Sequence, residues 1–426
     1  MQASEPAIIT AVSALEILDS RGRPTVQATV ALADGTIAVA GVPSGASTGS
    51  REAVERRDGD AARYGGLGVL GAVAAVGGEI ASCLTSREWY GLAEIDAALI
   101  ALDGTPDKSR LGANAIVGVS MACGRALAQA DGRSLWDWLT PPGVTPRLPV
   151  PHFNVINGGV HAPNPLDFQE FMIAPLGAPS FPEAVRAGAE VYGALRGLLA
   201  AKGYATGLGD EGGFAPQIAE PEEALELLVT AIGDAGYMPG RDGVAIALDP
   251  ASSEFRGEDG LYRVAGQALS STEMIERYAQ ITDRFPVWLI EDGLAENDWD
   301  GWAALTQRLG ERVQLVGDDI FVTNPAIIAE AISRGIGNAA LIKVNQIGTV
   351  TETLAAVAMC RDGGYAQFVS HRSGETTDTF IADLTVGAGC GMLKTGAPAR
   401  GERVAKYNRL LEIAASQPVM PYGLAR

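Results

Sequence analysis

The sequence contains few cysteines and few basic residues, and each shortage excludes a class of protein. Only four cysteines are present and none forms a C-x-x-C pair, so neither a disulfide framework nor a thiolate zinc site is indicated. The chain has 32 lysines and arginines against 51 aspartates and glutamates, which gives a formal net charge of −19. No basic excess exists to neutralise phosphates, so we expect neither nucleic acid nor an anionic membrane as a partner.

Long apolar runs are also missing. No uninterrupted apolar stretch is long enough to cross a bilayer, and Met1–Pro6 contains neither the basic nor the apolar region of a secretion signal. We therefore expect an intracellular, cytoplasmic protein whose cysteines are free thiols. The nucleophile-elbow motif G-x-S-x-G, the Walker loop and zinc-ligand spacings are absent as well.

What the chain does have is length and a large apolar fraction. Its 426 residues, 47% of them hydrophobic, suit a barrel of roughly 250 residues plus a second domain. Residues 7–42 alternate around an Asp34–Gly35 turn, which is typical of an antiparallel meander. We predict an N-terminal α+β capping domain over residues 1–140 and a catalytic α/β barrel over residues 141–426. The helices predicted from periodicity cover residues 50–58, 70–84, 91–102, 113–130, 181–201, 221–235, 271–283, 324–334 and 350–362.

Six apolar segments in the second part each end in a polar residue. The residues at these ends are Asp249, Glu291, Asp318, Lys343, His371 and Lys394. Subtracting successive positions gives spacings of 42, 27, 25, 28 and 23 residues. About 25 residues suit one strand, one loop and one helix, and a (β/α) barrel carries its chemistry at the C-terminal ends of its strands. Three acids and two lysines are therefore expected to converge at one barrel mouth.

These acids and lysines predict a metal-assisted proton transfer. Any one of Asp249, Glu291 and Asp318 alone would be typical of a solvated strand end, but three on consecutive strands favour a metal site. Oxygen ligands without histidine or cysteine select Mg²⁺ over zinc. The lysines indicate removal of a proton next to a carboxylate, where divalent cations hold the charge that develops. The base has to be a neutral lysine, and nearby cations lower its pKa.

Other segments offer further candidates. Glu211 lies in a glycine-flanked loop, and Glu170 lies between apolar residues, where an unpaired carboxylate would titrate high. His161 occupies a flexible loop that could deliver it to a ligand, whereas His152 is interpreted as structural. The triplet His371-Arg372-Ser373 places a bidentate cation beside a hydroxyl, which suits phosphate.

Two glycine-rich stretches have an ordinary and a functional interpretation. Residues 43–49 form either a linker or a lid that closes over an anion through hydroxyls and glycine amides. Residues 66–71 match the G-x-G-x-x-G dinucleotide motif, but a polar loop precedes them where a strand is required. A glycine-rich turn is the better interpretation, and a nucleotide-dependent oxidoreductase is the alternative.

Taken in order, the motifs resemble those of the enolase family. They are residues 19–22, 43–49, 157–159, 169–172, 209–213, 290–292, 317–319, 343–348, 370–375 and 394–396. The resemblance implies an enolase-type (β/α)8 barrel with an N-terminal α+β domain, in which the second barrel strand and helix depart from the parallel pattern. It also implies Mg²⁺-dependent elimination of water from 2-phosphoglycerate to give phosphoenolpyruvate.

The resemblance assigns the catalytic roles. Lys343 is implied as the general base that takes the C2 proton, and Lys394 as the residue that binds the substrate carboxylate beside the metals. Glu211 is implied as the general acid that helps hydroxide leave C3, supported by Glu170. His161 is implied to close over the phosphate from its loop.

Metal and substrate ligands follow from the same resemblance. Two Mg²⁺ ions per active site are implied. Asp249, Glu291 and Asp318 would hold the first ion, and the second would arrive with substrate and be bound through Ser47 and the phosphate. The residues implied to bind the substrate, a small anionic phospho-acid, are Arg372, Ser373, His371, Gln169 and Ser47.

Several positions depart from the family pattern. Arg23 and Gln27 stand where Asn and Glu are usual, in a stretch that contributes to the family's dimer contact, although a homo-oligomer, dimer or higher, is still expected. Val160 and Pro163 flank His161, and proline stiffens a lid that has to close. The alternatives are the same elimination on a carboxylated or phosphonoformyl analogue, resembling the carboxyphosphonoenolpyruvate synthases of phosphinate antibiotic pathways, or a non-catalytic scaffold.

Overall fold

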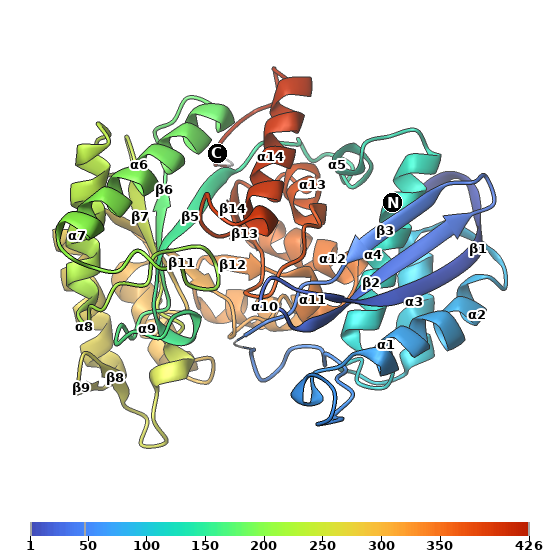
Figure 1. The fold of residues 1–426 in the computed structure, drawn as a ribbon, viewed down its shortest axis with the longest axis horizontal. Coiled ribbons are helices and arrows are strands. Elements are labelled where there is room, and N and C mark those ends of the chain that lie inside the picture. The colour runs from blue at the N-terminus through green and yellow to red at the C-terminus, as the bar shows by residue number, and fades with distance from the viewer. Residues whose placement is uncertain (1, 47, 425–426) are drawn as a thin grey trace.

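The computed structural model describes residues 2–46 and 48–424, in which two regions lie side by side (Figure 1). One is a four-stranded sheet with its helices, drawn mainly in blue. The other is a closed eight-stranded barrel surrounded by helices. This is the fold class that the sequence predicted, an α/β barrel preceded by an α+β region.

The N-terminal sheet confirms the predicted meander. Its strands are β1 (Gln2–Leu18), β2 (Pro24–Leu32), β3 (Ile37–Gly41) and β4 (Glu88–Gly91), in the order β3-β2-β1-β4 with antiparallel pairing. Asp34 and Gly35 lie in the turn between β2 and β3. Gly35 has a φ of 91°, and the backbone N–H of Thr36 donates to Oδ1 of Asp34 at 2.8 Å.

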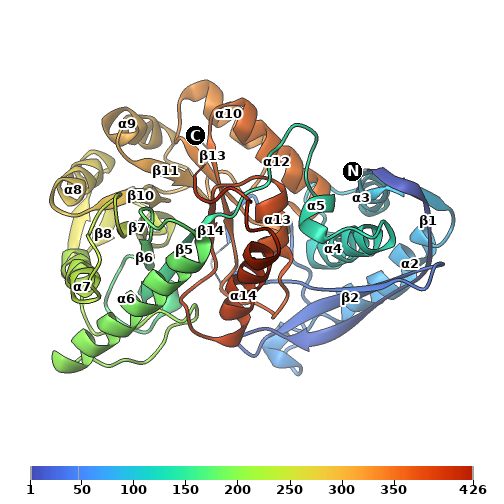
Figure 2. The same ribbon diagram turned by 90° about the horizontal axis from the view of Figure 1, so that it is seen from above.

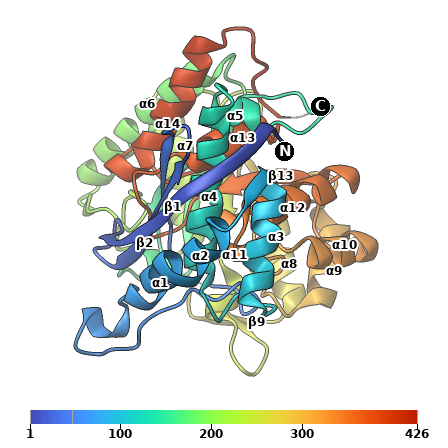
Figure 3. The same cartoon turned by 90° about the vertical axis from the view of Figure 1, so that its right-hand side faces the viewer.

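Helices lie against this sheet, and Figure 3 shows α4 beside β1 and β2, while α3 contacts β4. They are α1 (Leu70–Ala75), the π turn η2 (Val76–Ile80), α2 (Ala81–Leu84), α3 (Leu92–Asp103), α4 (Ala113–Ala130) and α5 (Leu135–Trp138). Val26, Ala28 and Val30, at alternate positions of β2, are fully buried. One face of β2 therefore packs on α4, as the period of a strand requires.

The helix predicted for residues 50–58 does not form. The backbone N–H groups of Ala53 and Val54 donate to the carbonyls of Gln346 and Asp107, at 2.8 Å each. A helix would need these groups for bonds to residues four positions earlier. Hydrogen bonds to distant segments therefore override the local pattern.

The glycine-rich segment 66–71 is a turn. The short 3₁₀ element η1 (Tyr64–Gly66) leads into it, with positive φ angles at Gly65 and Gly66, and α1 begins at Leu70. No described strand leads directly into it, since β3 ends at Gly41, so the strand–turn–helix context of a dinucleotide site is missing.

The barrel strands follow the order β10-β11-β12-β13-β14-β5-β6-β7. They are β5 (Val150–Asn157), β6 (Glu170–Ala174), β7 (Ala245–Asp249), β10 (Val287–Glu291), β11 (Gln314–Gly317), β12 (Ala339–Ile342), β13 (Ala366–Ser370) and β14 (Met392–Lys394). All neighbours are parallel except β6, which is antiparallel to both β5 and β7. Because β6 is reversed, its first residue, Glu170, lies at the rim, paired with the last residue of β7, Asp249.

Helices surround the barrel (Figure 2). They are α6 (Phe181–Ala201), α7 (Pro221–Asp234), α8 (Ser271–Arg284), α9 (Trp299–Leu309), α10 (Pro325–Arg334), α11 (Val344–Ile347), α12 (Val350–Asp362), α13 (Phe380–Gly387) and α14 (Gly401–Ser416). Ser270 starts α8 by accepting a bond from the backbone N–H of Glu273, and Pro325 is the first residue of α10. None of the described helices combines the length and apolarity needed to cross a bilayer.

Shorter elements complete the described fold. They are the hairpin β8 (Tyr262–Val264) and β9 (Gln267–Leu269), and the 3₁₀ turns η3 (Gly159–His161) and η4 (Ser252–Phe255). The turn η3 belongs to the predicted lid around His161 and lies between β5 and β6, close to the barrel mouth.

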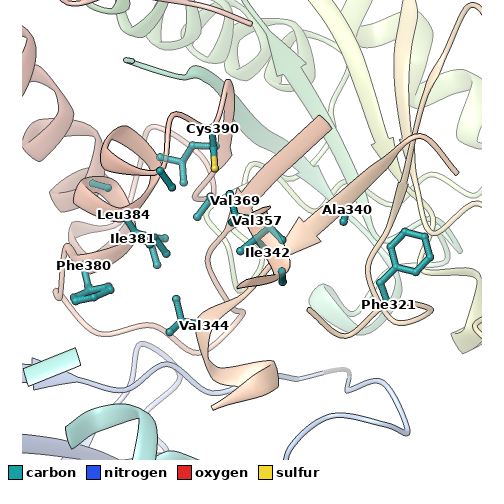
Figure 4. Close-up of a cluster of buried hydrophobic side chains, with 14 of the residues drawn as sticks. Phe321, Ala340, Ile342, Val344, Val357, Val369, Phe380, Ile381, Leu384 and Cys390 are labelled. Carbon is teal, nitrogen blue, oxygen red and sulfur yellow. The ribbon is translucent and has the colours of Figure 1, made fainter. Parts of the chain in front are cut away.

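Apolar side chains fill both faces of the barrel wall. The interior cluster combines small and large residues, including Ala174, Ala245, Ala247, Ala339, Trp288 and Phe368. On the outer face, Figure 4 shows Ile342 of β12 and Val369 of β13 near Val357 of α12, with Leu384 of α13 close by. Burial on both faces explains why the strands appear in the sequence as continuous apolar runs.

Candidate functional site

Three acids and one lysine meet at the barrel mouth. Nζ of Lys394, at the end of β14, donates to Oε2 of Glu170 at 3.1 Å, Oδ2 of Asp249 at 3.2 Å and Oε1 of Glu291 at 2.6 Å. These side chains are almost completely buried. Burial alone would lower the pKa of Lys394, but the charges of Glu170, Glu291 and Asp249 outweigh it and raise that pKa well above its ordinary value.

The second lysine forms a separate pair. Lys343 directly follows β12, and its ammonium donates to Oδ2 of Asp318, which directly follows β11. Burial alone would lower the pKa of Lys343, but the charge of Asp318 outweighs this effect and raises that pKa. Oδ1 of Asp318 also accepts a bond from Nε2 of Gln346 at 2.8 Å. In this structure Lys343 is therefore an ammonium with a buried partner.

Glu211 and Glu170 face His161. Nδ1 of His161 lies 3.7 Å from Oε1 of each carboxylate. Burial, together with the charge of Glu211, raises the pKa of Glu170 well above its ordinary value. Burial would also raise the pKa of Glu211, but His371 and His161 outweigh it and lower that pKa well below its ordinary value. The pKa values of the two carboxylates are thus shifted in opposite directions.

The phosphate-binding candidates lie where the N-terminal region touches the barrel. Nη1 and Nη2 of Arg372 donate to the carboxylate of Glu52, at 2.8 and 3.1 Å, and Nη1 donates to Oδ1 of Asn345 at 3.1 Å. Oγ of Ser373 accepts a bond from the backbone N–H of Ala46 at 3.1 Å. A cavity of about 260 Å³ adjoins this junction, with Glu52 and Asn345 in its wall.

The remaining candidates differ in how they are placed. Gln169 is buried next to Glu170, and its backbone N–H donates to the carbonyl of Asp249 at 3.1 Å. The position predicted as a ligand of the second metal, Ser47, lies outside the described residues. His152 sits inside the barrel near Trp288 and Phe368, and burial lowers its pKa to about 3. A neutral ring in that setting agrees with a structural role.

The predicted metal ligands are divided between the two lysines, because Asp249 and Glu291 pair with Lys394 whereas Asp318 pairs with Lys343. Two groups of buried residues bring potential ligand atoms within 4.8 Å of one another, namely His161 with Glu170 and Glu211, and Asp292 with Asp318 and Asp319. Asp249 and Glu291 instead share Lys394. Burial and the charge of Asp249 raise the pKa of Glu291 well above its ordinary value, and Oε2 of Glu291 is buried without a partner among the described residues. An unpaired oxygen in an all-oxygen set fits a hard dication such as Mg²⁺.

Several residues of the site were missed from the sequence. Asn345 and Gln346 belong to the motif around Lys343, which was the available signal, but no role was assigned to them. Glu52 lies in the segment wrongly predicted as a helix. Asp292 has a left-handed φ of 41°, and its carboxylate accepts the backbone N–H groups of Asp318 and Asp319 at 2.8 and 2.9 Å. It therefore fixes the backbone that presents Asp318.

Comparison with known proteins agrees with this geometry. A family model for the N-terminal domain of enolase matches residues 9–139, and a model for the C-terminal TIM barrel domain of enolase matches residues 145–417. The chain is also 56% identical over 407 residues to an enolase from Acidothermus cellulolyticus, which covers 96% of this chain and 94% of that relative. The chain therefore belongs to the enolase family.

Proposed function

We propose that this chain is a carbon–oxygen hydro-lyase that eliminates water from 2-phosphoglycerate to give phosphoenolpyruvate with the help of Mg²⁺. The observation that carries this proposal is the meeting of two lysines and a set of buried carboxylates at the barrel mouth of a chain 56% identical to an enolase. The comparisons do not favour the carboxylated or phosphonoformyl analogue as the substrate.

Asp249, Glu291 and Asp318 are proposed to hold one Mg²⁺, and Ser47 to bind a second together with the substrate phosphate. Bound Mg²⁺ supplies positive charge next to the substrate carboxylate, where negative charge develops during the reaction. Lys394, which lies among these acids, is proposed to bind the same carboxylate.

Lys343 is proposed to remove the proton from C2. Its ion pair with Asp318 retains the proton on the amine in this structure, whereas burial favours the neutral form. Once Asp318 serves as a metal ligand, its charge no longer holds that proton in place. The buried amine then becomes a base directed at the carbon acid.

Glu211 is proposed to protonate the hydroxide that leaves C3. Its pKa is lowered well below the ordinary value by His371 and His161 against the effect of burial, whereas burial raises the pKa of Glu170 well above the ordinary value. Glu211 therefore has to gain a proton before it acts as an acid. Glu170 is proposed to supply it, with His161 lying 3.7 Å from both carboxylates.

Arg372 and Ser373 are proposed to bind the substrate phosphate. An arginine fork matches phosphate oxygens, and Ser373 already contacts Ala46 in the hydroxyl-rich loop. His161 is proposed to close over the phosphate, and His371 and Gln169 to complete the substrate pocket. The hydroxyl-rich loop contributes Pro43, Gly45, Thr48 and Gly49 to the wall of the cavity beside Glu52.

The direct test offers the purified chain and Mg²⁺ either 2-phosphoglycerate or its phosphonoformyl analogue. The enol phosphate product is followed by its ultraviolet absorbance. We expect rapid turnover of 2-phosphoglycerate and little turnover of the analogue. Selective turnover of the analogue would instead support the antibiotic-pathway alternative. If neither compound reacts while the protein is folded and binds Mg²⁺, the chain is a scaffold.

We also propose that the chain works in the cytoplasm as a homo-oligomer. The support for assembly is an apolar strip on the outer face of the N-terminal sheet. Leu15, Ile37 and Val39 are exposed by 60%, 63% and 40%. Ile37 and Val39 lie across from Ala11 and Ser13 through β2, and Leu15 continues the same face. A strip of this kind is suited to burial against a second copy.

A further inference from the structure

Arg403 occupies an unusual place for an arginine. It lies in the first turn of α14 and is completely buried. Nη1 donates to the carbonyl of Arg372 at 2.6 Å, and Nη2 to those of Ser373 at 2.5 Å and Asp210 at 3.3 Å. One guanidinium thus joins the phosphate-binding segment after β13 to the loop that carries Glu211. A buried cation with three carbonyl partners holds these two segments in a fixed relation.

The same guanidinium determines how His371 is protonated. Nη1 of Arg403 bonds to Nδ1 of the imidazole. Arginine is only a donor, so Nδ1 has to be the acceptor. Burial and, to a smaller extent, the charge of Arg403 lower the pKa of His371 to about 3 against the opposing effect of Glu211, so the ring is neutral at pH 7. A neutral ring has a single proton, which then lies on Nε2.

The other side of the ring faces the proposed general acid. Nε2 of His371 lies 3.1 Å from Oε2 of Glu211, and the same oxygen accepts a bond from Nδ2 of Asn154 at 2.9 Å. With the proton on Nε2, the protonated nitrogen is the one beside this carboxylate, although the two atoms do not form an aligned hydrogen bond in this structure. With the proton on Nδ1, the ring would present a lone pair and repel the carboxylate.

We propose that Arg403 is a positioning residue that fixes His371 as its Nε2–H tautomer and so places an N–H beside Glu211. Asn154 then holds Oε2 of Glu211 by a hydrogen bond and His371 keeps a protonated nitrogen beside the same oxygen, which leaves Oε1 as the oxygen that carries the proton to the leaving group. The catalytic consequence rests on the proposed function, but the tautomer of His371 does not.

The first test needs no substitution of Arg403. The chain has only three histidines, so selective ¹⁵N labelling gives three imidazoles, which His152→Gln and His161→Gln assign. A long-range ¹H–¹⁵N correlation on the full chain with Mg²⁺ at pH 7 reports which nitrogen carries the proton. We expect His371 to be entirely Nε2–H. An Nδ1–H ring, or a mixture of the two, overturns the proposal.

The second test separates positioning from a merely structural role. Arg403→Lys keeps the charge but loses the fork, so we expect mixed tautomers at His371 and a kcat for dehydration lowered roughly 10- to 100-fold. Exchange of the C2 proton with solvent, which depends on Lys343, should stay within about threefold of the wild-type rate. Arg409→Lys is the matched control, because Arg409 lies on the same helix but binds Asp383.

Each outcome of the second test is decisive. A folded Arg403→Lys variant that keeps a pure Nε2–H tautomer contradicts the role of Arg403, and so does equal loss of C2 exchange and dehydration. If the variant does not fold, the wild-type spectrum still tests the assignment. If the wild-type chain does not act on 2-phosphoglycerate, the proposed function is wrong. The tautomer measurement still tests whether Arg403 fixes the proton of His371 on Nε2.

Discussion

Arg372 and Glu52 form a bidentate ion pair between the barrel and the N-terminal region, with N–O distances of 2.8 and 3.1 Å. The two side chains are only 3% and 9% exposed. Oε1 of Glu52 also accepts bonds from Nε2 of Gln346 at 3.2 Å and from the backbone N–H of Gly49 at 3.1 Å. The N-terminal region therefore places its own anion on the cation that is proposed to bind phosphate.

Replacing this anion should make phosphate bind more tightly. In Glu52→Gln the partner of the buried Arg372 guanidinium no longer carries a negative charge. We therefore expect the dissociation constant of inorganic phosphate to fall about tenfold. Titration calorimetry without substrate measures it. Glu55→Gln is the control, because Glu55 pairs with Arg57 instead. An unchanged constant in Glu52→Gln would show that Glu52 and phosphate do not compete for Arg372.

Removing the proposed base should stop the first chemical step. In Lys343→Ala we expect exchange of the C2 proton of 2-phosphoglycerate in D₂O to slow by about 10³-fold or more. Mg²⁺ affinity should not fall, because Asp318 loses an ammonium partner and keeps its charge. NMR spectroscopy measures the rate of C2 proton exchange, and titration calorimetry measures the Mg²⁺ affinity. Lys202→Ala, at an exposed position after α6, controls for loss of a lysine elsewhere. Exchange at the wild-type rate would mean that another group is the base.

A buried acid where α3 meets α12 should make stability depend on pH. Burial raises the pKa of Asp96 to about 6, although the backbone N–H of Thr351 donates to its Oδ2 at 3.0 Å. A raised pKa in the folded state favours the protonated form. The contribution of Asp96 to the free energy of unfolding is therefore intact below pH 4 and falls by about 3 kcal/mol as pH rises through 6.

Asp96→Asn should remove this dependence and unfold at higher urea concentration than wild type at pH 7.5, with the difference shrinking toward pH 4. Urea titrations at four pH values measure it. Asp300→Asn, which changes a fully exposed carboxylate, is the control. Parallel pH profiles for wild type and Asp96→Asn would rule out an ionised Asp96 as a source of instability.

The apolar strip of the N-terminal sheet predicts an assembly that charge can break. We expect the pair of substitutions Leu15→Glu and Ile37→Glu to convert the oligomer to monomer at micromolar concentration, because carboxylates resist burial between two copies. Light scattering after size-exclusion chromatography gives the mass. Leu70→Glu, at an exposed apolar position on α1, should leave the mass unchanged. A wild-type chain that is monomeric at this concentration would contradict the proposed homo-oligomer.

The residues at the ends of the parallel strands were predictable because strand period and spacing determine where they point. Asp249, Glu291 and Lys394 follow from apolar runs that end in a polar residue, and the structure brings them together. Glu170 does not follow from that rule. Its strand is reversed, so the residue at the rim begins the strand, and only the resemblance to a family indicated its place.

Sequence patterns did not indicate the residues whose roles depend on contacts that form only in the folded chain. Glu52 lies in a segment with helical periodicity whose backbone bonds to distant carbonyls instead. Arg403 lies near the start of a helix that carries several basic residues, and nothing in their spacing shows which of them turns inward. Such positions depend on which side chains the finished fold brings together.

The lysine ammonium groups among the carboxylates have a consequence for how the protein matures. Lys394 and Lys343 already balance the negative charge that would otherwise drive the strand ends apart. We therefore expect the newly made polypeptide to fold without magnesium and to bind the proposed ion afterwards. Removal of that ion with a chelator should then abolish activity without unfolding the protein, and adding magnesium back should restore activity.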